Sequence, residues 1–287
     1  PVEPHEAGKG PTGGALGELS RARTMGLAAE GALDIEALRQ RITDIETRLN
    51  AQITDQLASQ GVRLLRGTGK LKGPHEVVVD TEDGVEELGA DAILVATGSR
   101  PRIPDWVTVD GERVLTTRQA YPPAEIPEHL IVIGSGVTGV EFTHMFSSLG
   151  SRVTLLVSRQ QVLPSKDPEV AAVLEADFIR RGVQLAKGAR ANSIERDGDV
   201  VRVLCEDGRT ATGSHVVLAV GSIPNSEGLG LDAAGVEVDA NGYVPISHHL
   251  QSNVLHIYAA GDLSGKLPLS SVAAMQGRKV AEHVMGL

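Results

Sequence analysis

The sequence predicts an α/β protein in which parallel strands alternate with helices. Short apolar runs bounded by glycine and proline are typical of buried strands, and one of them leads into a glycine-rich turn, a helix and a second strand. A strand–glycine–proline unit also occurs twice, which indicates two domains of one design. The 287 residues are long for one domain and sufficient for two.

Composition excludes several classes of function. An apolar fraction of 41% supports a real core. The 27 basic and 37 acidic residues give a net charge of -10, the opposite of a nucleic-acid-binding surface. No apolar run approaches the ~20 residues of a membrane span. We therefore expect a small-molecule partner, no nucleic acid, no membrane span and a cytoplasmic location.

Cysteine and histidine placement argues against metal and disulfide chemistry within these residues. Cys205 is the single cysteine, so the sequence holds no disulfide, no CxxC or CxxxxC pair and no thiolate zinc cluster. The histidines show no metal-ligand spacing except the adjacent pair His248 and His249, and neighbours on a strand point to opposite faces. We expect no metal site.

The first part of the chain predicts a loop followed by a long helix. Residues 1–15 are rich in glycine and proline and predict a loop or disordered lead. Asp34 predicts the N-cap of a helix whose apolar residues recur at spacings of three and four until Gly61 ends it. This helix would carry one apolar stripe.

Strands and a linker are expected next. The turn at Asp83-Gly84 joins the second and third of three predicted short strands. A fully apolar run follows and predicts a buried parallel strand, and a proline-rich segment after it predicts a linker and a domain boundary. In order, these elements occupy residues 62–66, 77–80, 85–88, 92–96 and 99–127.

The second part of the chain has the periodicity of a βαβ unit. Gly150 and Gly182 each end a predicted helix, and Asp207-Gly208 forms a hairpin turn. The predicted strands are 130–133, 153–157, 200–205, 209–213 and 216–219, and the predicted helices are 137–149, 168–181 and 272–285.

The strongest single motif is the run Gly134, Ser135, Gly136, Val137, Thr138, Gly139. It has the G-x-G-x-x-G pattern, follows a strand and opens a helix. Gly134 permits the tight turn, Gly136 lets the backbone approach a pyrophosphate, and Gly139 lets the helix pack on the strand. The anion would then lie at the helix N-terminus. The alternative is a plain glycine-rich turn between strand and helix.

A second literal match at residues 8–13 lacks this context. No strand precedes it and no second strand follows at the right distance, so we expect no nucleotide site there. Glu141 follows Gly139 by two residues and is expected on the first turn of the same helix, where an acid also complements the helix dipole.

The repeat compares two segments of similar order. The first contains the Asp83-Gly84 turn, an apolar strand and the run 96–101, ATGSRP. The second contains the Asp207-Gly208 turn, an apolar strand and the run 219–224, AVGSIP. Two Rossmann-like nucleotide-binding domains would produce this duplication.

Four motifs together resemble one family. They are GSGVTGVE at 134–141, LVATGSRP at 94–101, LAVGSIPN at 218–225 and YAAGD at 258–262. In this order they resemble the FAD/NAD(P)-linked pyridine nucleotide–disulfide oxidoreductases over roughly residues 16–287. Within that family the chain is most similar to lipoamide-dehydrogenase-like NAD(P)H quinone reductases, through GLGL at 228–231 and LPLSSVAAMQGR at 267–278.

The resemblance implies FAD and NAD(P) as cofactors and hydride transfer from NAD(P)H to FAD. Glu141 would be the catalytic residue, at the contact between nicotinamide and flavin. The remaining implied cofactor-binding residues are Gly134, Ser135, Gly136, Val137, Thr138, Gly139, Ser158, Arg159, Gly221, Ala96, Thr97, Gly98, Gly261 and Asp262.

The resemblance also implies the domain organisation. Residues 16–126 and 247–287 would form an incomplete, discontinuous FAD-binding domain, and residues 127–246 an NAD(P)-binding domain inserted into it. The family's first FAD fingerprint, its CxxxxC dithiol and its C-terminal dimerisation domain do not occur in this sequence. We therefore expect the chain to be the middle of a longer, homodimeric protein and to bind little FAD alone.

Three functions remain in view. The first is an NAD(P)H-dependent flavoprotein oxidoreductase that passes electrons to an acceptor, with a quinone favoured over a disulfide. The second is dihydrolipoyl dehydrogenase, which needs the dithiol. The third is a non-catalytic remnant that binds NAD(P). The second strand of the βαβ unit ends in VSRQ at 157–160 without an acid for a ribose 2′-hydroxyl, so we favour NADP over NAD, with Arg159 on the 2′-phosphate.

Overall fold

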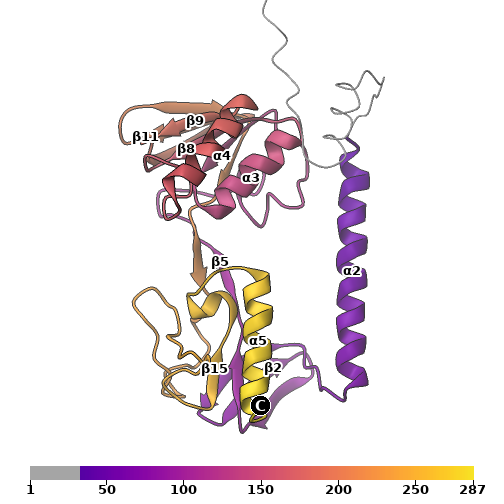
Figure 1. Ribbon diagram of the computed structural model, residues 1–287. Coiled ribbons are helices and arrows are strands. Elements are labelled where there is room, and N and C mark those ends of the chain that lie inside the picture. The colour runs from indigo at the N-terminus through magenta and orange to yellow at the C-terminus, as the bar shows by residue number, and fades with distance from the viewer. Residues whose placement is uncertain (1–32) are drawn as a thin grey trace, which may run out of the picture. The chain divides into compact units, whose positions relative to one another are not determined.

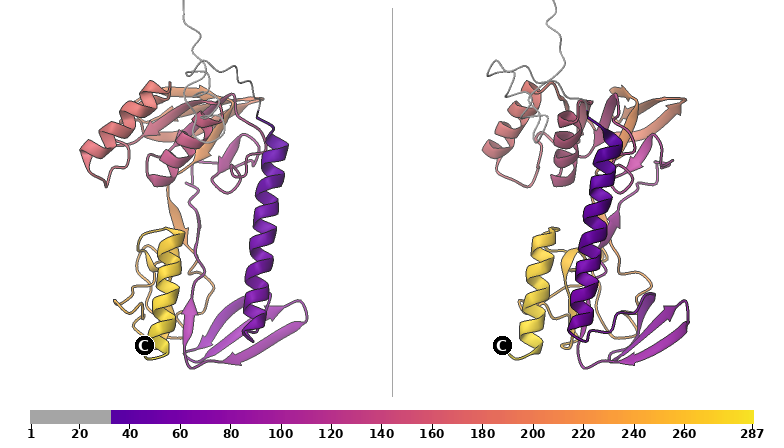
Figure 2. Two further views of the ribbon diagram at one scale, coloured as in Figure 1. Left: turned by 45° about the vertical axis from the view of Figure 1, so that its right-hand side comes forward. Right: turned by 90° about the vertical axis from the view of Figure 1, so that its right-hand side faces the viewer.

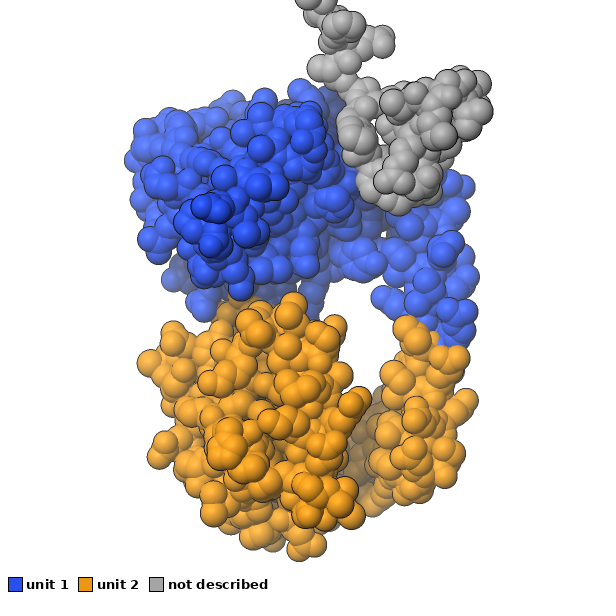
Figure 3. Space-filling model, viewed as in Figure 1, with its two compact units in different colours: residues 1–48, 101–221 blue, residues 49–100, 222–287 orange. Residues whose placement is uncertain are grey.

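The computed structural model describes residues 33–287, and these divide into two compact units. Unit 1 comprises residues 33–48 and 101–221, and unit 2 comprises 49–100 and 222–287 (Figure 3). The predicted lead at 1–15 and the second glycine motif at 8–13 lie outside the described residues. Among residues 33–287, every helix is too short or too polar to cross a membrane.

Unit 1 is built on a five-stranded parallel sheet, in the order β6-β13-β7-β8-β9 (Figure 1). Helix α3 connects β7 to β8, as the sequence predicts for a βαβ unit, and helix α4 connects β8 to β9, a strand that the sequence analysis did not predict. The bounds are β6 Val114–Thr116, β7 His129–Ile133, α3 Val137–Ser148, β8 Arg152–Val157, α4 Pro168–Arg180, β9 Gln184–Lys187 and β13 His215–Leu218.

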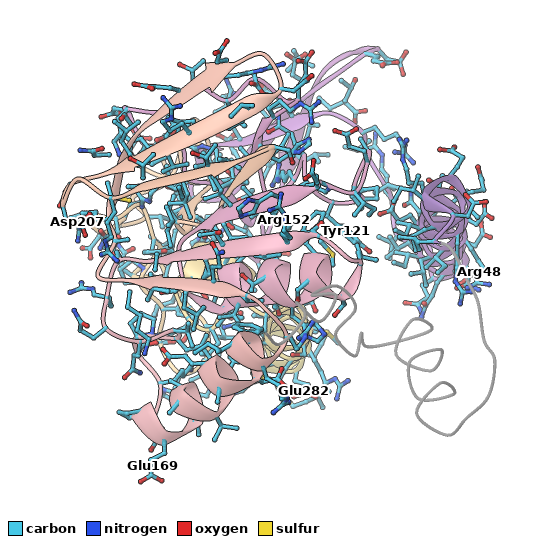
Figure 4. The ribbon with its side chains drawn as sticks, turned by 90° about the horizontal axis from the view of Figure 1, so that it is seen from above. Arg48, Tyr121, Arg152, Glu169, Asp207 and Glu282 are labelled. Atoms are coloured by element: carbon cyan, nitrogen blue, oxygen red, sulfur yellow. The ribbon has the colours of Figure 1, made fainter. Side chains whose placement is uncertain are left out.

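The parallel sheet is covered on both faces. Side chains alternate along β7, so that Leu130 and Val132 enter one apolar cluster with Phe146 of α3 and Phe178 of α4. Their neighbours on the strand enter a second cluster with an antiparallel sheet on the opposite face (Figure 4). That sheet consists of β10 Ala191–Asp197, β11 Val200–Cys205 and β12 Thr210–Gly213, in this order. Burial on both faces explains why the strands read as continuous apolar runs.

Unit 2 contains a three-stranded antiparallel sheet and a short parallel pair (Figure 2). Its C-terminal helix packs through Val280 against Tyr258 in a small apolar cluster. The bounds are β1 Thr68–Gly73, β2 Glu76–Thr81, β3 Gly84–Gly89, β4 Ile93–Val95, β15 Ile257–Ala259, the 3-10 turn η1 Gly261–Ser264 and α5 Ser270–Val284.

The sequence repeat corresponds to a structural repeat. In each copy a three-stranded antiparallel sheet precedes a strand that pairs in parallel, and a glycine in the left-handed region follows, Gly98 with φ 68° and Gly221 with φ 93°. The final segments of the two copies, β5 Ser99–Pro101 and β14 Ser222–Pro224, pair with each other. The duplicated glycine–serine–proline runs are therefore partners in one small sheet.

Helix α2, Ile35–Ser59, confirms the predicted long helix. Its N-cap is Asp34, whose carboxylate accepts a hydrogen bond of 2.9 Å from the Ala37 amide. The chain leaves the helix at Gly61, which adopts φ 72°. The predicted apolar stripe is present, and no residue of α2 is buried within the described part of the chain.

Two strand predictions need correction. Residues 62–66 are not a strand, because Val62 and Leu64 are exposed and no neighbouring strand pairs with them among the described residues. The run 92–96 does form a parallel strand, β4, but only Ile93 is buried and Leu94 is 42% exposed. Apolar character alone does not reveal how many faces of a strand are covered.

The boundaries between the two compact units differ from the domain boundaries predicted from the sequence. The segment 99–127 is not merely a linker, because β6 within it pairs in parallel with β13 and so completes the sheet of unit 1. Residues 231–244 supply side chains to the same apolar cluster as Ile93 and Ile257 of unit 2. As functional domains, the FAD-binding and NAD(P)-binding assignments stay predictions.

Candidate functional site: a glycine-rich turn at the carboxyl edge of the parallel sheet

The predicted glycine motif forms the turn between β7 and α3. Gly134 follows the strand with φ 110°, a value that residues with a Cβ rarely adopt. Gly136 is the N-cap of α3 in an extended conformation, and no side chain caps the helix. The first amide groups of a helix have no partner within the helix, so this uncapped end presents free N–H donors.

The three glycines of the motif have different surroundings. A Cβ on Gly139 would lie 1.8 Å from the carbonyl oxygen of Gly134, so α3 packs directly on the turn. A Cβ on Gly134 would lie 2.3 Å from the carbonyl oxygen of Ala219, the residue that follows β13. At Gly136 nothing lies within 4 Å of that position. Close packing thus requires glycine at positions 134 and 139, whereas Gly136 borders open space.

Accessibility within the motif follows the same division. Gly136, Val137 and Thr138 are exposed, whereas Ser135 and Gly139 are buried. The carbonyl of Ser135 accepts a hydrogen bond of 2.7 Å from the amide of Leu163. The exposed half of the turn is therefore backbone and short side chains at a helix N-terminus, which is the arrangement that favours an anion.

The turn lies where the chain changes direction across the sheet. From β7 the chain proceeds through α3 to β8 on one side, while β13 pairs with β7 on the other. Ile133 and Leu218, the last residues of β7 and β13, lie opposite each other, and Ile133 also lies opposite Leu156, the residue before the end of β8. Gly134, Gly221 and Ser158 therefore follow the carboxyl ends of adjacent strands. Open α/β sheets bind ligands at such a switch point.

The chain after β8 supplies the next predicted residues. Val157 is fully buried, whereas Ser158 and Arg159 are exposed. The backbone of Arg159 is held by a hydrogen bond of 3.0 Å from the Gly188 amide to its carbonyl oxygen. Its guanidinium makes no hydrogen bond or ion pair that the structure shows among residues 33–287, and Gln160 brings no acid to this strand end. The guanidinium of Arg159 therefore lies after the end of β8 without a carboxylate partner among residues 33–287.

Glu141 lies on the second turn of α3, which corrects the prediction of a first-turn position. The helix begins at Val137 and has no acidic residue in its first turn, so Glu141 does not cap the dipole there. Its side chain is exposed and lines a pocket of about 490 Å³. The other lining residues are Thr117, Arg118, Tyr121, Phe142 and Met145.

Sequence reasoning did not find these lining residues. Thr117, Arg118 and Tyr121 belong to the segment that the sequence assigned to a linker, and no local pattern relates them to α3. The spacing of Glu141 and Met145, one helical turn apart, is the only signal that the sequence offered.

In unit 2 the predicted residues are held by side-chain hydrogen bonds. Thr97 and Asn225 exchange two, from the Thr97 hydroxyl to the Asn225 carbonyl at 2.7 Å and from the Asn225 side-chain amide to the Thr97 carbonyl at 2.9 Å. The Ser99 hydroxyl donates to the Asp262 carboxylate at 2.6 Å. Hydrogen bonds between residues of the two copies of the repeat thus stabilise the segment that follows β4. This segment contains Ala96, Thr97 and Gly98.

The turn after β15 is equally ordered. Gly261 adopts φ 70°, and its amide donates to the side-chain oxygen of Gln276 at 2.7 Å. The Ser264 hydroxyl donates to the Gly261 carbonyl at 2.7 Å. Asp262 is therefore presented from a short, well-bonded turn at the carboxyl end of β15. Within residues 33–287 no group of three or more His, Cys, Asp or Glu residues is placed to hold a metal ion.

The fold and the turn together define a class, the dinucleotide-binding α/β proteins. The profile of the pyridine nucleotide-disulphide oxidoreductases matches residues 13–277. The chain belongs to this family, as the resemblance predicted.

Individual relatives agree with the family assignment. The chain is 42% identical to an NAD(P)H dehydrogenase (quinone) of Mycobacterium tuberculosis and 31% identical to a dihydrolipoyl dehydrogenase of Zymomonas mobilis, covering 94% of this chain in each case. It spans 57% and 59% of those two proteins. The crystal structure of LpdA from Mycobacterium tuberculosis superposes with a TM-score of 0.87 at 42% identity, over 94% of this chain and 60% of that one.

Proposed function

We propose that this chain is the nicotinamide-dinucleotide-binding part of an NAD(P)H-dependent flavoprotein oxidoreductase whose electron acceptor is a quinone. The observation that carries the proposal is the turn at residues 134–139. It has an uncapped helix N-terminus and open space at Gly136. At Gly134 and Gly139 any side chain would collide with backbone oxygen atoms. A pyrophosphate fits such a turn because amide donors and the helix dipole both favour it.

The residues divide into roles along the dinucleotide. Gly134, Gly136 and Gly139 shape the turn, and the amides near Val137 and Thr138 bind the pyrophosphate. Ser158 and Arg159 lie toward the adenosine ribose, with Arg159 on a 2′-phosphate. Glu141, beside an apolar pocket on the same helix, lies toward the nicotinamide and its contact with the flavin.

FAD, when bound, would accept the hydride that NAD(P)H donates. Gly261 and Asp262 follow the carboxyl end of β15, and we assign them to the ribityl and phosphate region of the flavin. The Asp262 carboxylate, oriented by Ser99, is suited to accept hydrogen bonds from ribityl hydroxyls. Ala96, Thr97 and Gly98 follow the neighbouring strand β4, and Gly221 is the equivalent glycine of the second copy.

The acceptor separates the two enzymatic alternatives. A quinone is favoured by the 42% identity to a protein named for quinone reduction. Dihydrolipoyl dehydrogenase is the alternative, favoured by several relatives near 30% identity. A homodimeric, cytoplasmic whole protein completes the proposal and rests on the family resemblance.

Two measurements test the proposal, the first of them on the 287-residue chain. Titration with NADPH and NADH, followed by the fluorescence of the reduced nicotinamide, should show saturable binding that is lost in Gly136→Val. A visible spectrum then separates the flavoprotein from the non-catalytic remnant. Because the 287-residue chain is expected to bind little FAD alone, this spectrum is taken on the chain extended at its N-terminus. A yellow extended protein that reduces a quinone but not lipoamide supports the proposal, and a colourless one that binds NADPH but reduces nothing supports the remnant.

A further inference from the structure

Glu175 is a buried carboxylate that the proposed chemistry leaves unexplained. It lies on α4 and is only 7% exposed, although acidic residues on a surface helix usually face water. A buried carboxylate destabilises the fold unless its oxygen atoms find partners. Both oxygen atoms of Glu175 have one, and the two partners lie on different segments, the loop after β8 and the end of β9.

The first partner is in the loop between β8 and α4. One carboxylate oxygen accepts a hydrogen bond of 2.9 Å from the amide of Val162, three residues after Arg159. The other accepts a hydrogen bond from the ammonium group of Lys187, the last residue of β9. Lys187 directly precedes Gly188, whose amide binds the carbonyl of Arg159. The contacts thus form a closed circuit from Arg159 through Val162, Glu175 and Lys187 back to Arg159.

The same loop is tied to the glycine-rich turn. Leu163 adopts φ 48°, a conformation that is strained for a residue with a Cβ. In this conformation its amide reaches the carbonyl of Ser135 at 2.7 Å. The loop therefore cannot shift at residues 162–163 without disturbing either the Glu175 carboxylate or the turn at Ser135.

We infer that Glu175 is a positioning residue that sets where Ser158 and Arg159 lie, and with them the preference for a dinucleotide that carries a 2′-phosphate. This inference rests on the proposed function. Glu175 need not touch the nucleotide itself. It holds the loop backbone, while the exposed side chains of Ser158 and Arg159 contact the ribose.

The test compares dissociation constants for NADPH and NADH on the full chain. Glu175→Ala removes the anchor, so NADPH binding should weaken about tenfold and NADH binding much less, and the NADPH preference should fall by about fivefold. Glu175→Gln keeps an oxygen acceptor for the Val162 amide but turns an NH2 donor toward the Lys187 ammonium, so the NADPH preference should fall to a value between those of the unsubstituted chain and Glu175→Ala. If Glu175→Ala does not fold, Glu175→Asp takes its place, because its carboxylate is too short to reach both partners.

Two control variants separate positioning from general stability. Val201→Ala lies on the opposite face of the sheet and should lower the melting temperature without changing the NADPH preference. Glu169→Gln removes an exposed charge from the same helix and should change neither. A Glu175→Ala chain that melts earlier but keeps the wild-type preference would overturn the inference.

The outcomes also separate this inference from the proposed function. If the unsubstituted chain binds both nucleotides without discrimination, the loop does not recognise a 2′-phosphate, and the role of Glu175 is refuted while dinucleotide binding stands. If the unsubstituted chain binds neither nucleotide, both proposals fail.

Discussion

The carbonyl oxygen of Gly134 lies 1.8 Å from the position that a Cβ on Gly139 would occupy. The two glycines are five positions apart in the sequence, and the contact joins the start of α3 to the end of β7. Because the obstructing atom belongs to the backbone, no rotation of a side chain relieves the collision. The position therefore requires glycine for packing, independently of any ligand.

Gly139→Ala should consequently destabilise unit 1. Overpacking a close contact costs about 1–3 kcal/mol and occasionally more, and here the helix must move to admit the methyl group. We expect a loss of at least ~2 kcal/mol in the free energy of unfolding, measured by urea denaturation, together with weaker nucleotide binding. A variant as stable as the wild-type chain would show that α3 sits farther from the turn than the structure indicates.

Gly136→Val should have the opposite profile. Nothing lies within 4 Å of a Cβ at Gly136, and its backbone is extended, so the fold should tolerate the side chain. The valine methyl groups would occupy the space into which a pyrophosphate must come. Losing a few charge-assisted hydrogen bonds of ~1.5–3 kcal/mol each implies at least about tenfold weaker NADPH binding. Unchanged affinity in a titration would exclude this turn as the binding site.

Local patterns predicted the elements around this turn well. The βαβ unit from His129 to Val157 needs only an apolar run, a glycine motif and a helical stripe, and each is visible within a few residues of sequence. The N-cap Asp34 and the hairpin at Asp207-Gly208 are similarly local. Physical causes that act over short separations leave a readable pattern.

Contacts between distant residues left no such pattern. The three residues of β6 gain their place only by pairing with β13, about a hundred residues later. Ser99 and Asp262 are 163 residues apart, and Thr97 and Asn225 are 128 apart. Glu175 looks like any acidic residue on an amphipathic helix until the fold brings Val162 and Lys187 to it. Contacts between residues that are distant in the sequence determine these positions, and the propensity of a single residue does not predict such contacts.

Arg159→Ala should weaken NADPH binding selectively. An arginine–phosphate contact at an exposed site contributes ~1.5–3 kcal/mol, so the dissociation constant for NADPH should rise about ten- to a hundredfold while that for NADH hardly changes. Ser158→Glu should reverse the preference, because the exposed position admits a carboxylate that accepts from a ribose hydroxyl and repels a phosphate. Val157 is unsuitable for this exchange because it is fully buried.

The comparison of NADPH and NADH on the three chains decides the assignment. Arg152→Ala serves as the matched control, since Arg152 lies at the opposite end of β8 and pairs with Glu128. Should the unsubstituted chain prefer NADH, or should Arg159→Ala weaken both nucleotides equally, Arg159 would be an ordinary surface arginine.

Stability should fall as the pH drops below about 6.5, because unit 1 holds three histidines in their neutral form. Burial lowers the pKa of His215, and the nearby Arg113 guanidinium lowers it further, although Glu125 opposes both. Burial and Arg181 lower the pKa of His144 in the same way. Burial and Arg152 lower the pKa of His129.

The direction of the pH dependence follows from these shifts. Each histidine has a lower pKa in the folded chain than the 6.5 of the unfolded chain, so the unfolded state binds more protons as the pH falls through this range. The stability that the neutral histidines contribute is therefore fully present well above pH 6.5 and is lost progressively as the pH falls through that value. The pKa of Asp110 is lowered to about 2, so the stability that this carboxyl contributes is present above its unfolded value of 3.8 and is lost only below it, outside the range of pH 5 to 7.

Urea denaturation at pH 7, 6 and 5 should show this decline, and His215→Gln should reduce its slope. The glutamine amide oxygen can still accept a hydrogen bond from Arg113, which lies 3.1 Å from His215 Nε2, but the side chain takes up no proton. His215 is 2% exposed, so burial opposes charging it in place, although the Glu125 carboxylate, 2.9 Å from its Nε2, acts in the other direction. An unfolding free energy that stays level from pH 7 to pH 5, or a slope that His215→Gln leaves intact, would contradict this account.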